Sequence, residues 1–217
     1  MAGDSLAANL APALAGWGSS SGRARVSNMA VAGCGVGRGG EVRLGELLRD
    51  SSPVCANWEA AWGEIVASVD PDIVVIHSAT WDLLPRRLEG WDDFAEIGDP
   101  AFDDWLLSEY VRATEVLTAT GAELVWLIPP CVNFDAPGLD GDQGAIDRLG
   151  RLLSTRLAPP GSIGVRTTDL AGRVCPDGRF SDSVEGVANA RPDGIHFSDE
   201  AASRLSEWLG PEILGDA

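Results

Sequence analysis

The chain carries the stretch Ile73-Val74-Val75-Ile76-His77 directly after the turn sequence Asp70-Pro71-Asp72. A continuous apolar run of this length, without polar alternation, is typical of a strand buried on both faces of a parallel sheet. A second run, Glu123–Ile128, has the same character and stops at Pro129-Pro130. The segment between the two runs has the pattern of a long helix, so together they predict a β-α-β unit.

The rest of the chain continues this alternation. The expected helices are Leu6–Ala15, Asn57–Val69, Phe102–Thr120, Gln143–Leu157 and Asp199–Leu209. The expected strands are Arg25–Ala32, Ile73–His77, Glu123–Ile128 and Ile163–Thr167. This order predicts an α/β fold, a three-layer α/β/α sandwich whose parallel sheet carries helices on both faces.

Expectations for a ligand site follow from this fold. The crevice of an open parallel sheet lies beyond the carboxyl ends of its strands. Ala79, Pro129 and the loop at Gly33 fall just past strand ends, so we expect them to line it. The long stretches Leu83–Pro100 and Leu170–Pro192 are expected to form lids or substrate loops.

Length and charge narrow the class of protein. The 217 residues suffice for one well-buried domain and are short for two. The formal net charge is −17 and the chain contains no lysine, so nucleic-acid binding is not expected. No apolar run reaches 18 residues and no secretory signal is recognised, so direct membrane insertion is not predicted either.

The four cysteines are even in number and form no CxxC pair, so their spacing does not indicate a metal site. Three disulfide pairings are possible. We favour Cys34–Cys55 with Cys131–Cys175, because each bond would join one loop region to another. Such bonds imply an oxidising compartment, whereas four separate buried thiols would fit the cytoplasm.

Two short motifs suggest a reaction. Ser5 follows Gly3-Asp4, and His196 stands three residues after Asp193 in a loop that contains Pro and Gly. A serine hydroxyl needs a base within hydrogen-bond reach to act as a nucleophile, and the chain has only two histidines. A carboxylate close to His196 can fix its tautomer and leave the other ring nitrogen for Ser5. The motifs therefore predict a catalytic triad of Ser5, His196 and Asp193.

The order of these motifs along the whole chain resembles the SGNH (GDSL) hydrolase superfamily. The resemblance implies a flavodoxin-like parallel sheet and no metal or organic cofactor. It implies that Ser5 is the nucleophile and that the backbone N–H groups of Ser5 and Gly33 form the oxyanion hole. Most relatives have Gly-x-Asn-Asp in the third block, where this chain has Ala79-Thr80-Trp81-Asp82. Trp81 thus replaces an amide donor, and Trp81 and Asp82 are candidate oxyanion or substrate-binding residues.

A closer resemblance is to the SGNH domains fused to membrane acyltransferase-3 proteins. They share the acidic residue after tryptophan in the third block and a Gly-Cys-Gly sequence such as Gly33-Cys34-Gly35. This resemblance implies an extracytoplasmic domain that moves acyl groups onto cell-surface glycans, with a membrane acyltransferase domain upstream. Only Met1-Ala2 precede Gly3, which leads us to expect a truncated first strand and a polypeptide that extends upstream.

The function expected on these grounds is that of a serine esterase or O-acyltransferase, acting on a small-molecule or glycan ester. One alternative is an inactive glycan-binding relative, because Trp81 replaces an oxyanion donor. Another is a nucleotide-dependent oxidoreductase, because Gly35–Gly40 matches GxGxxG. We expect His77 to be a hydrogen-bonded core residue, and Trp81, Trp91 and Trp126 to lie at or near the crevice.

Overall fold

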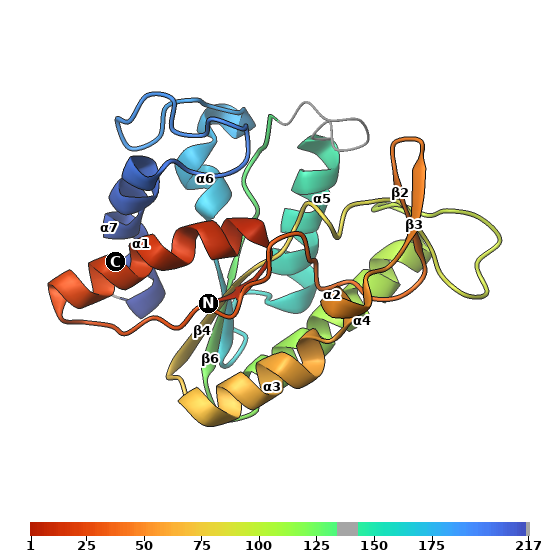
Figure 1. The fold of residues 1–217 in the computed structure, drawn as a ribbon, viewed down its shortest axis with the longest axis horizontal. Helices are drawn as coiled ribbons and strands as arrows, with labels where there is room; N and C mark the ends of the chain where they lie inside the picture. The colour runs from red at the N-terminus through yellow and green to blue at the C-terminus, as the bar shows by residue number, and fades with distance from the viewer. Residues whose placement is uncertain (134–142, 216–217) are drawn as a thin grey trace.

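The computed structural model describes residues 1–133 and 143–215. Within them, four parallel strands form the central sheet in the order β1-β4-β6-β7 (Figure 1). These strands are β1 (Ala2–Gly3), β4 (Ile73–His77), β6 (Glu123–Leu127) and β7 (Val165–Thr168). Every neighbouring pair is parallel, with Ala2 opposite Ile76 and Val74 opposite Leu124. The predicted α/β class is confirmed.

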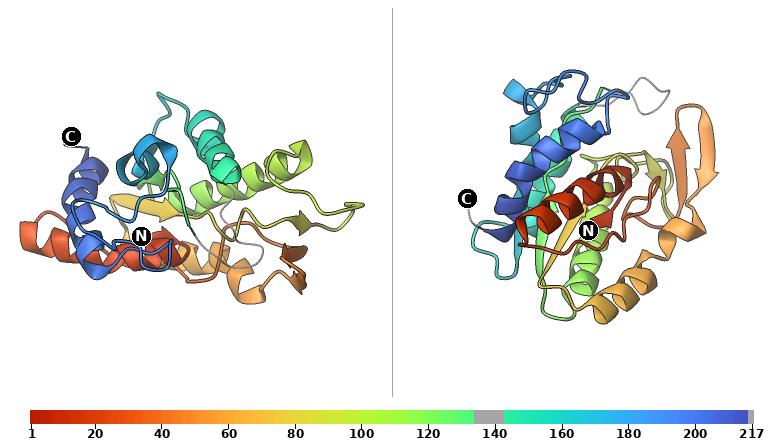
Figure 2. Two further views of the ribbon diagram at one scale, coloured as in Figure 1. Left: turned by 90° about the horizontal axis from the view of Figure 1, so that it is seen from above. Right: turned by 60° about the vertical axis from the view of Figure 1, so that its left-hand side comes forward.

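Helices cover both faces of this sheet (Figure 2). The longer ones are α1 (Ser5–Ser21), α3 (Trp58–Val69), α4 (Pro100–Leu117), α5 (Gln143–Leu152) and α7 (Asp199–Leu214). Helices α1 and α7 pack against one another on one face, and α3, α4 and α5 cover the other. Short elements complete the chain: α2 (Pro53–Ala56), α6 (Leu170–Val174), a π-helical turn η1 (Leu153–Leu157) and a 3₁₀ turn η2 (Pro176–Gly178).

The two layers of apolar core explain the unbroken apolar run of β4. Val75 packs into the core shared with α1 and α7, whereas Val74 and Ile76 pack into the core shared with α3, α4 and α5. Successive side chains of a strand point to opposite faces of the sheet. When helices cover both faces, the side chains at every position of the strand must therefore be apolar.

The expected strand Arg25–Ala32 is not formed. The segment runs beside β1 at the edge of the sheet, where the N–H of Met29 donates to Met1 and that of Val31 donates to Gly3. β1 contains only two residues, so it offers too few partners for a ladder. The prediction was wrong because strand propensity can be read from the sequence of a segment, whereas the length of the strand it must pair with, here β1, cannot.

An antiparallel sheet that was not predicted projects from the domain (Figure 1). Strands β2 (Glu41–Leu44) and β3 (Leu47–Asp50) form a hairpin, and β5 (Arg86–Arg87) pairs with β2. Through β5, the segment Leu83–Pro100 is joined to this hairpin.

Both favoured disulfides are present. Cys34 is bonded to Cys55, and Cys131 is bonded to Cys175. Stable disulfides of this kind indicate an oxidising environment. Among the described residues, no helix is both long and apolar enough to cross a membrane.

Candidate active site

The turn from β1 into α1 presents Ser5 as the first residue of the helix. Asp4 caps α1, since its Oδ1 accepts from the N–H of Leu6 at 3.0 Å and from that of Ala7 at 3.4 Å. Gly3 has a φ of +119°, and a Cβ at that position would lie 1.7 Å from the carbonyl oxygen of His77. Only glycine lets β1 pass this close to the end of β4.

Ser5, His196 and Asp193 form a continuous hydrogen-bonded chain. Nε2 of His196 lies 2.8 Å from Oγ of Ser5, and Nδ1 of the same ring lies 2.6 Å from Oδ2 of Asp193. The other carboxylate oxygen accepts from the backbone N–H groups of Ile195 and His196. The chain thus brings together residues 191 positions apart in the arrangement of nucleophile, base and orienting acid.

Electrostatics favour an ionised Asp193. Burial raises the pKa of this carboxyl, but the hydrogen bonds from His196 and from the backbone of Ile195 outweigh burial, so its pKa lies below the ordinary value. A carboxylate at this position holds the proton of His196 on Nδ1 and leaves Nε2 free to accept the proton of Ser5.

Residues that the sequence analysis did not single out hold the His196 loop in place. Asn9, one turn after Ser5 on α1, donates from Nδ2 to the carbonyl of Phe197 at 3.0 Å and accepts its N–H at 2.9 Å. Gly194 has a φ of +78°, and a Cβ there would lie 1.7 Å from the carbonyl oxygen of Asn133. The loop is therefore fixed both to the helix that carries the nucleophile and to the segment after β6.

Arg191 is a second support of this loop. Its guanidinium lies 4.9 Å from the ring centre of Phe180 and 5.4 Å from that of Phe197, and it donates to the carbonyl of Ile195. Burial lowers the pKa of this arginine to about 10. Arg191 was missed in the sequence analysis because nothing in the sequence indicates that a charged loop residue is buried between two aromatic rings.

The first turn of α1 leaves one amide available. The N–H groups of Leu6 and Ala7 donate to the carboxylate of Asp4, and that of Ala8 donates to the Asp4 carbonyl. Among the described residues the N–H of Ser5 has no acceptor. An unpaired amide on the nucleophile itself, at the positive end of a helix, is suited to stabilise an oxyanion.

Gly33 and Trp81, two other candidate oxyanion residues, are not among the residues that line the cleft of Ser5. Gly33 has a φ of +81° and its carbonyl contacts the sulfur of Cys55, so it sits in the disulfide-linked loop. Trp81 is half-buried and does not line the cleft, whereas Ala79 and Thr80 do. The structure therefore shows no contact that joins Gly33 or Trp81 to Ser5.

Asp82 is fully buried and organises the glycine-rich loop. Its carboxylate accepts from the N–H of Gly37 at 2.7 Å, from that of Val36 at 3.2 Å, and from the hydroxyls of Ser78 and Tyr110 at 2.5 and 2.9 Å. Burial raises the pKa of Asp82, and these hydrogen bonds offset that rise only in part. The geometry places Asp82 as a support of the loop rather than at the cleft surface.

The glycine-rich loop Gly35–Gly40 leads into strand β2 and not into a helix. A dinucleotide site of the GxGxxG type places the pyrophosphate on the N-terminus of the following helix, and this loop has none. In the part of the chain that the structure describes, no group of three or more His, Cys, Asp and Glu side chains is placed to hold a metal ion.

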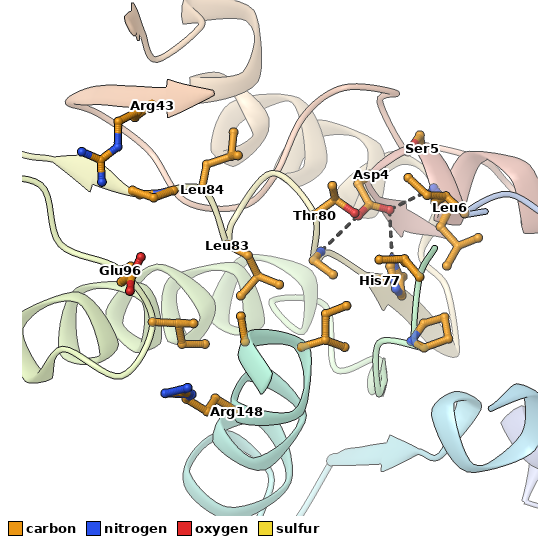
Figure 3. A pocket seen from close by; sticks show the side chains of 18 of the residues that line it. Asp4, Ser5, Leu6, Arg43, His77, Thr80, Leu83, Leu84, Glu96 and Arg148 are labelled. Carbon is orange, nitrogen blue, oxygen red and sulfur yellow. Dashed lines mark hydrogen bonds and ion pairs between the residues drawn. The ribbon is translucent and has the colours of Figure 1, made fainter. Parts of the chain in front are cut away.

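Ser5 opens into a cleft of about 530 Å³ beyond the carboxyl ends of the strands (Figure 3). The segment 83–100 lines it through Leu83, Leu84 and Ile97, as expected of a substrate loop. Of the described residues, none between 170 and 192 lines it, and Pro130 does so in place of Pro129.

Of the tryptophans expected near this cleft, Trp126 belongs to the core and the partly buried Trp91 packs against it. Trp126 is fully buried in β6, with its ring stacked 4.8 Å from that of Tyr110. Trp91 packs edge-on against Trp105 at 6.4 Å. The expectation for Trp126 was wrong because it precedes the end of β6 and points into the helical layer.

Comparison with solved structures shows the same fold. A proposed acylhydrolase from Bacteroides fragilis matches with a TM-score of 0.63 and 14% identity, over 99% of this chain and 85% of that one. A GDSL-like lipase from Bacteroides thetaiotaomicron matches with a TM-score of 0.58 and 12% identity, over 100% and 87%. A carbohydrate esterase of family 3 from Talaromyces cellulolyticus matches with a TM-score of 0.52 and 14% identity, over 99% and 95%. The fold is therefore that of the SGNH hydrolases.

At the level of sequence, a family model described as "Protein of unknown function (DUF459)" matches residues 1–211. No curated protein matches the chain.

Proposed function

This chain belongs to the DUF459 family of proteins of unknown function, and we propose that its site makes it a serine hydrolase of carboxylic esters. The observation that carries the proposal is the chain of hydrogen bonds from Ser5 through His196 to Asp193. The unpaired N–H of Ser5 and the cleft that Ser5 lines support the same reaction.

In the proposed reaction, His196 takes the hydroxyl proton of Ser5 as Oγ attacks the acyl carbonyl. The resulting oxyanion accepts a hydrogen bond from the N–H of Ser5. His196 then returns the proton to the departing alcohol, which leaves an acyl-Ser5 ester. A water molecule activated by His196 attacks this ester, releases the carboxylic acid and restores the serine hydroxyl.

The proposed substrate is an acylated carbohydrate or cell-surface glycan. One of the proteins that share the fold is named a carbohydrate esterase, and the cleft combines apolar walls with polar ends. If a sugar hydroxyl replaces water in the second step, the same intermediate serves an O-acyltransferase. The two disulfides fit a site of action outside the cytoplasm.

The test is hydrolysis of p-nitrophenyl acetate, combined with intact-mass analysis after treatment with a fluorophosphonate probe. The wild type is expected to turn over the ester and to gain one label, and Ser5→Ala is expected to lose both. Ser21→Ala, at the far end of α1, is the matched control and should retain both. Absence of turnover and label in a folded wild type would refute the proposal and favour a glycan-binding role.

A further inference from the structure

Two guanidinium groups stand at the end of the cleft that lies away from the nucleophile. Arg43 projects from β2 and Arg148 from α5, and both line the cleft that Ser5 lines. In Figure 3 both lie farther from Ser5 than Leu83 does, and Glu96 lies between them. A bound ester at Ser5 would thus extend along an apolar wall toward these two cations.

Neither arginine is neutralised by a carboxylate of the described protein. Arg43 lies 4.9 Å from the ring centre of Phe94, and Arg148 donates to the carbonyl of Gly144. By contrast, ion pairs with Asp or Glu among the described residues include those of Arg38, Arg87, Arg112, Arg156, Arg166 and Arg173. With 33 acidic and 16 basic residues in the chain, carboxylates are plentiful, so two such cations at one cleft end are available to a ligand.

One acidic side chain, Glu96, shares this end of the cleft. No ion pair within 4 Å joins Glu96 to Arg43 or Arg148 in the described structure, so the local charge is one net positive. Here the Glu96 carboxylate can accept a hydrogen bond from a hydroxyl of a ligand, while the guanidiniums pair with the anionic group of that ligand.

We propose that this cleft selects esters that carry an anionic group, a carboxylate or a phosphate, for which Arg43 and Arg148 supply the positive charge while Ser5 attacks the acyl carbon. The inference rests on the proposed esterase function and adds a substrate class to it. Guanidinium groups match the planar fork of a carboxylate and the oxygens of a phosphate. In a chain of net charge −17, local cations offset the repulsion that an anionic ligand meets from the rest of the protein.

The test compares three acetyl esters that differ in one substituent: an acetylated methyl glucoside, the matching glucuronide and the matching glucoside 6-phosphate. The wild type is expected to hydrolyse at least one anionic ester with a kcat/KM about tenfold above that of the neutral ester. Which of the two it prefers identifies the anion. Arg43→Gln and Arg148→Gln are each expected to reduce the preference about threefold, because an exposed ion pair contributes little.

Matched controls lie on the same hairpin and on the same helix. Arg49→Gln on β3 and Arg151→Gln on α5 remove exposed arginines that do not line the cleft, and both should keep the wild-type preference. Glu96→Gln removes a negative charge that repels an anionic ester, so it should raise the preference for the anionic ester about twofold. Added salt should weaken the preference in the wild type more than in the double variant Arg43→Gln/Arg148→Gln.

Two outcomes separate this inference from the proposed function. If p-nitrophenyl acetate is hydrolysed through Ser5 but the arginine variants keep the wild-type preference, the inference is wrong and the esterase stands. If no ester is hydrolysed, NMR titration of Ser5→Ala with methyl glucuronide and with glucose 6-phosphate still reports on the arginines. If either anion binds and its affinity falls in the double variant, the anion site is supported. If methyl glucoside binds as tightly as the two anions, the anion site is overturned.

Discussion

Asp4 and His77 form a buried pair beneath the nucleophile, with Oδ1 of Asp4 2.9 Å from Nδ1 of His77 and both side chains 3% exposed. The same carboxylate caps α1 and accepts the N–H of Ala79 through Oδ2 (Figure 3). One side chain therefore joins the start of α1 to the end of β4. His77 is the hydrogen-bonded core residue that its position in the strand predicted.

Asp4→Asn is expected to destabilise the protein in a pH-dependent manner. Burial raises the pKa of Asp4, but attraction and hydrogen bonding to His77, with the bond from Ala79, bring it below the ordinary value of 3.8. Because the folded-state pKa is depressed, the stabilisation is complete above pH 3.8 and is lost as the pH falls through the folded-state pKa. Removing the charge of a buried carboxylate that accepts several hydrogen bonds costs about 1.5–3 kcal/mol at pH 7.

Urea unfolding of the wild type and Asp4→Asn at pH 7 and at pH 3 measures this effect. The gap between their free energies of unfolding should narrow at pH 3. Asp193→Asn is the comparison, because that half-exposed carboxyl should change stability by less than about 1 kcal/mol. An equal gap at both values of pH would show that the charge of Asp4 does not contribute.

Asp193→Asn is instead expected to act on the reaction. The amide cannot hold the proton of His196 on Nδ1 as a carboxylate does, so the ring loses the tautomer that accepts the proton of Ser5. We expect kcat for p-nitrophenyl acetate to fall by about 10³- to 10⁴-fold, in line with the corresponding change in a serine protease triad. A loss below tenfold would mean that another group orients His196.

Asn9 does not contact the reacting atoms, so its replacement tests how far the position of His196 matters for catalysis. Asn9→Ala removes both hydrogen bonds to Phe197 and frees the residue next to His196. A displacement of about 1 Å can cost about 10² in rate. We expect kcat to fall by about 10- to 100-fold while KM changes less than threefold, and Asn9→Asp, which retains an acceptor for the Phe197 N–H, to recover part of kcat.

The triad could be predicted from sequence because two short motifs contain its three members and strand order brings the motifs together. The apolar run at Ile73–His77 predicted a sheet with helices on both faces, because a strand that is covered on both faces has apolar side chains at successive positions. Asn9 and Arg191 could not be predicted, because their roles depend on which loop lies against them. The hairpin of β2 and β3 was missed because its exposed strands lack a buried face and its charged residues obscure any alternation.

Backbone conformation at Gly3 gives a prediction with an internal control. Gly3→Ala would place Cβ 1.7 Å from the carbonyl oxygen of His77 at a φ of +119°, so β1 would separate from β4. We expect a loss of more than about 3 kcal/mol in unfolding free energy, from the clash and the strained backbone together. Gly16 lies in the following helix α1, and a Cβ there would have nothing within 4 Å, so Gly16→Ala should stabilise the protein by about 0.5–1 kcal/mol. Thermal unfolding of the two variants should therefore shift in opposite directions.

The two disulfides are expected to differ in their contribution to stability. Cys131–Cys175 closes 44 residues and Cys34–Cys55 closes 21, which correspond to about 4 and about 3 kcal/mol of lost chain entropy in the unfolded state. Cys131 and Cys175 are also buried in the core, whereas Cys34 and Cys55 are half-buried. Replacing each pair by alanine and measuring urea unfolding should therefore show the larger loss for Cys131→Ala/Cys175→Ala.

The two disulfides should also differ in how their loss affects catalysis. Cys131 stands between Pro130 and Val132, which both line the cleft, so loss of this bond should lower kcat/KM as well as stability. Loss of Cys34–Cys55 releases the loop of Gly33. If the N–H of Gly33 contributes to the oxyanion hole, this variant should lose kcat by about tenfold or more with little change in KM. An unchanged kcat would leave the N–H of Ser5 as the donor that the geometry supports.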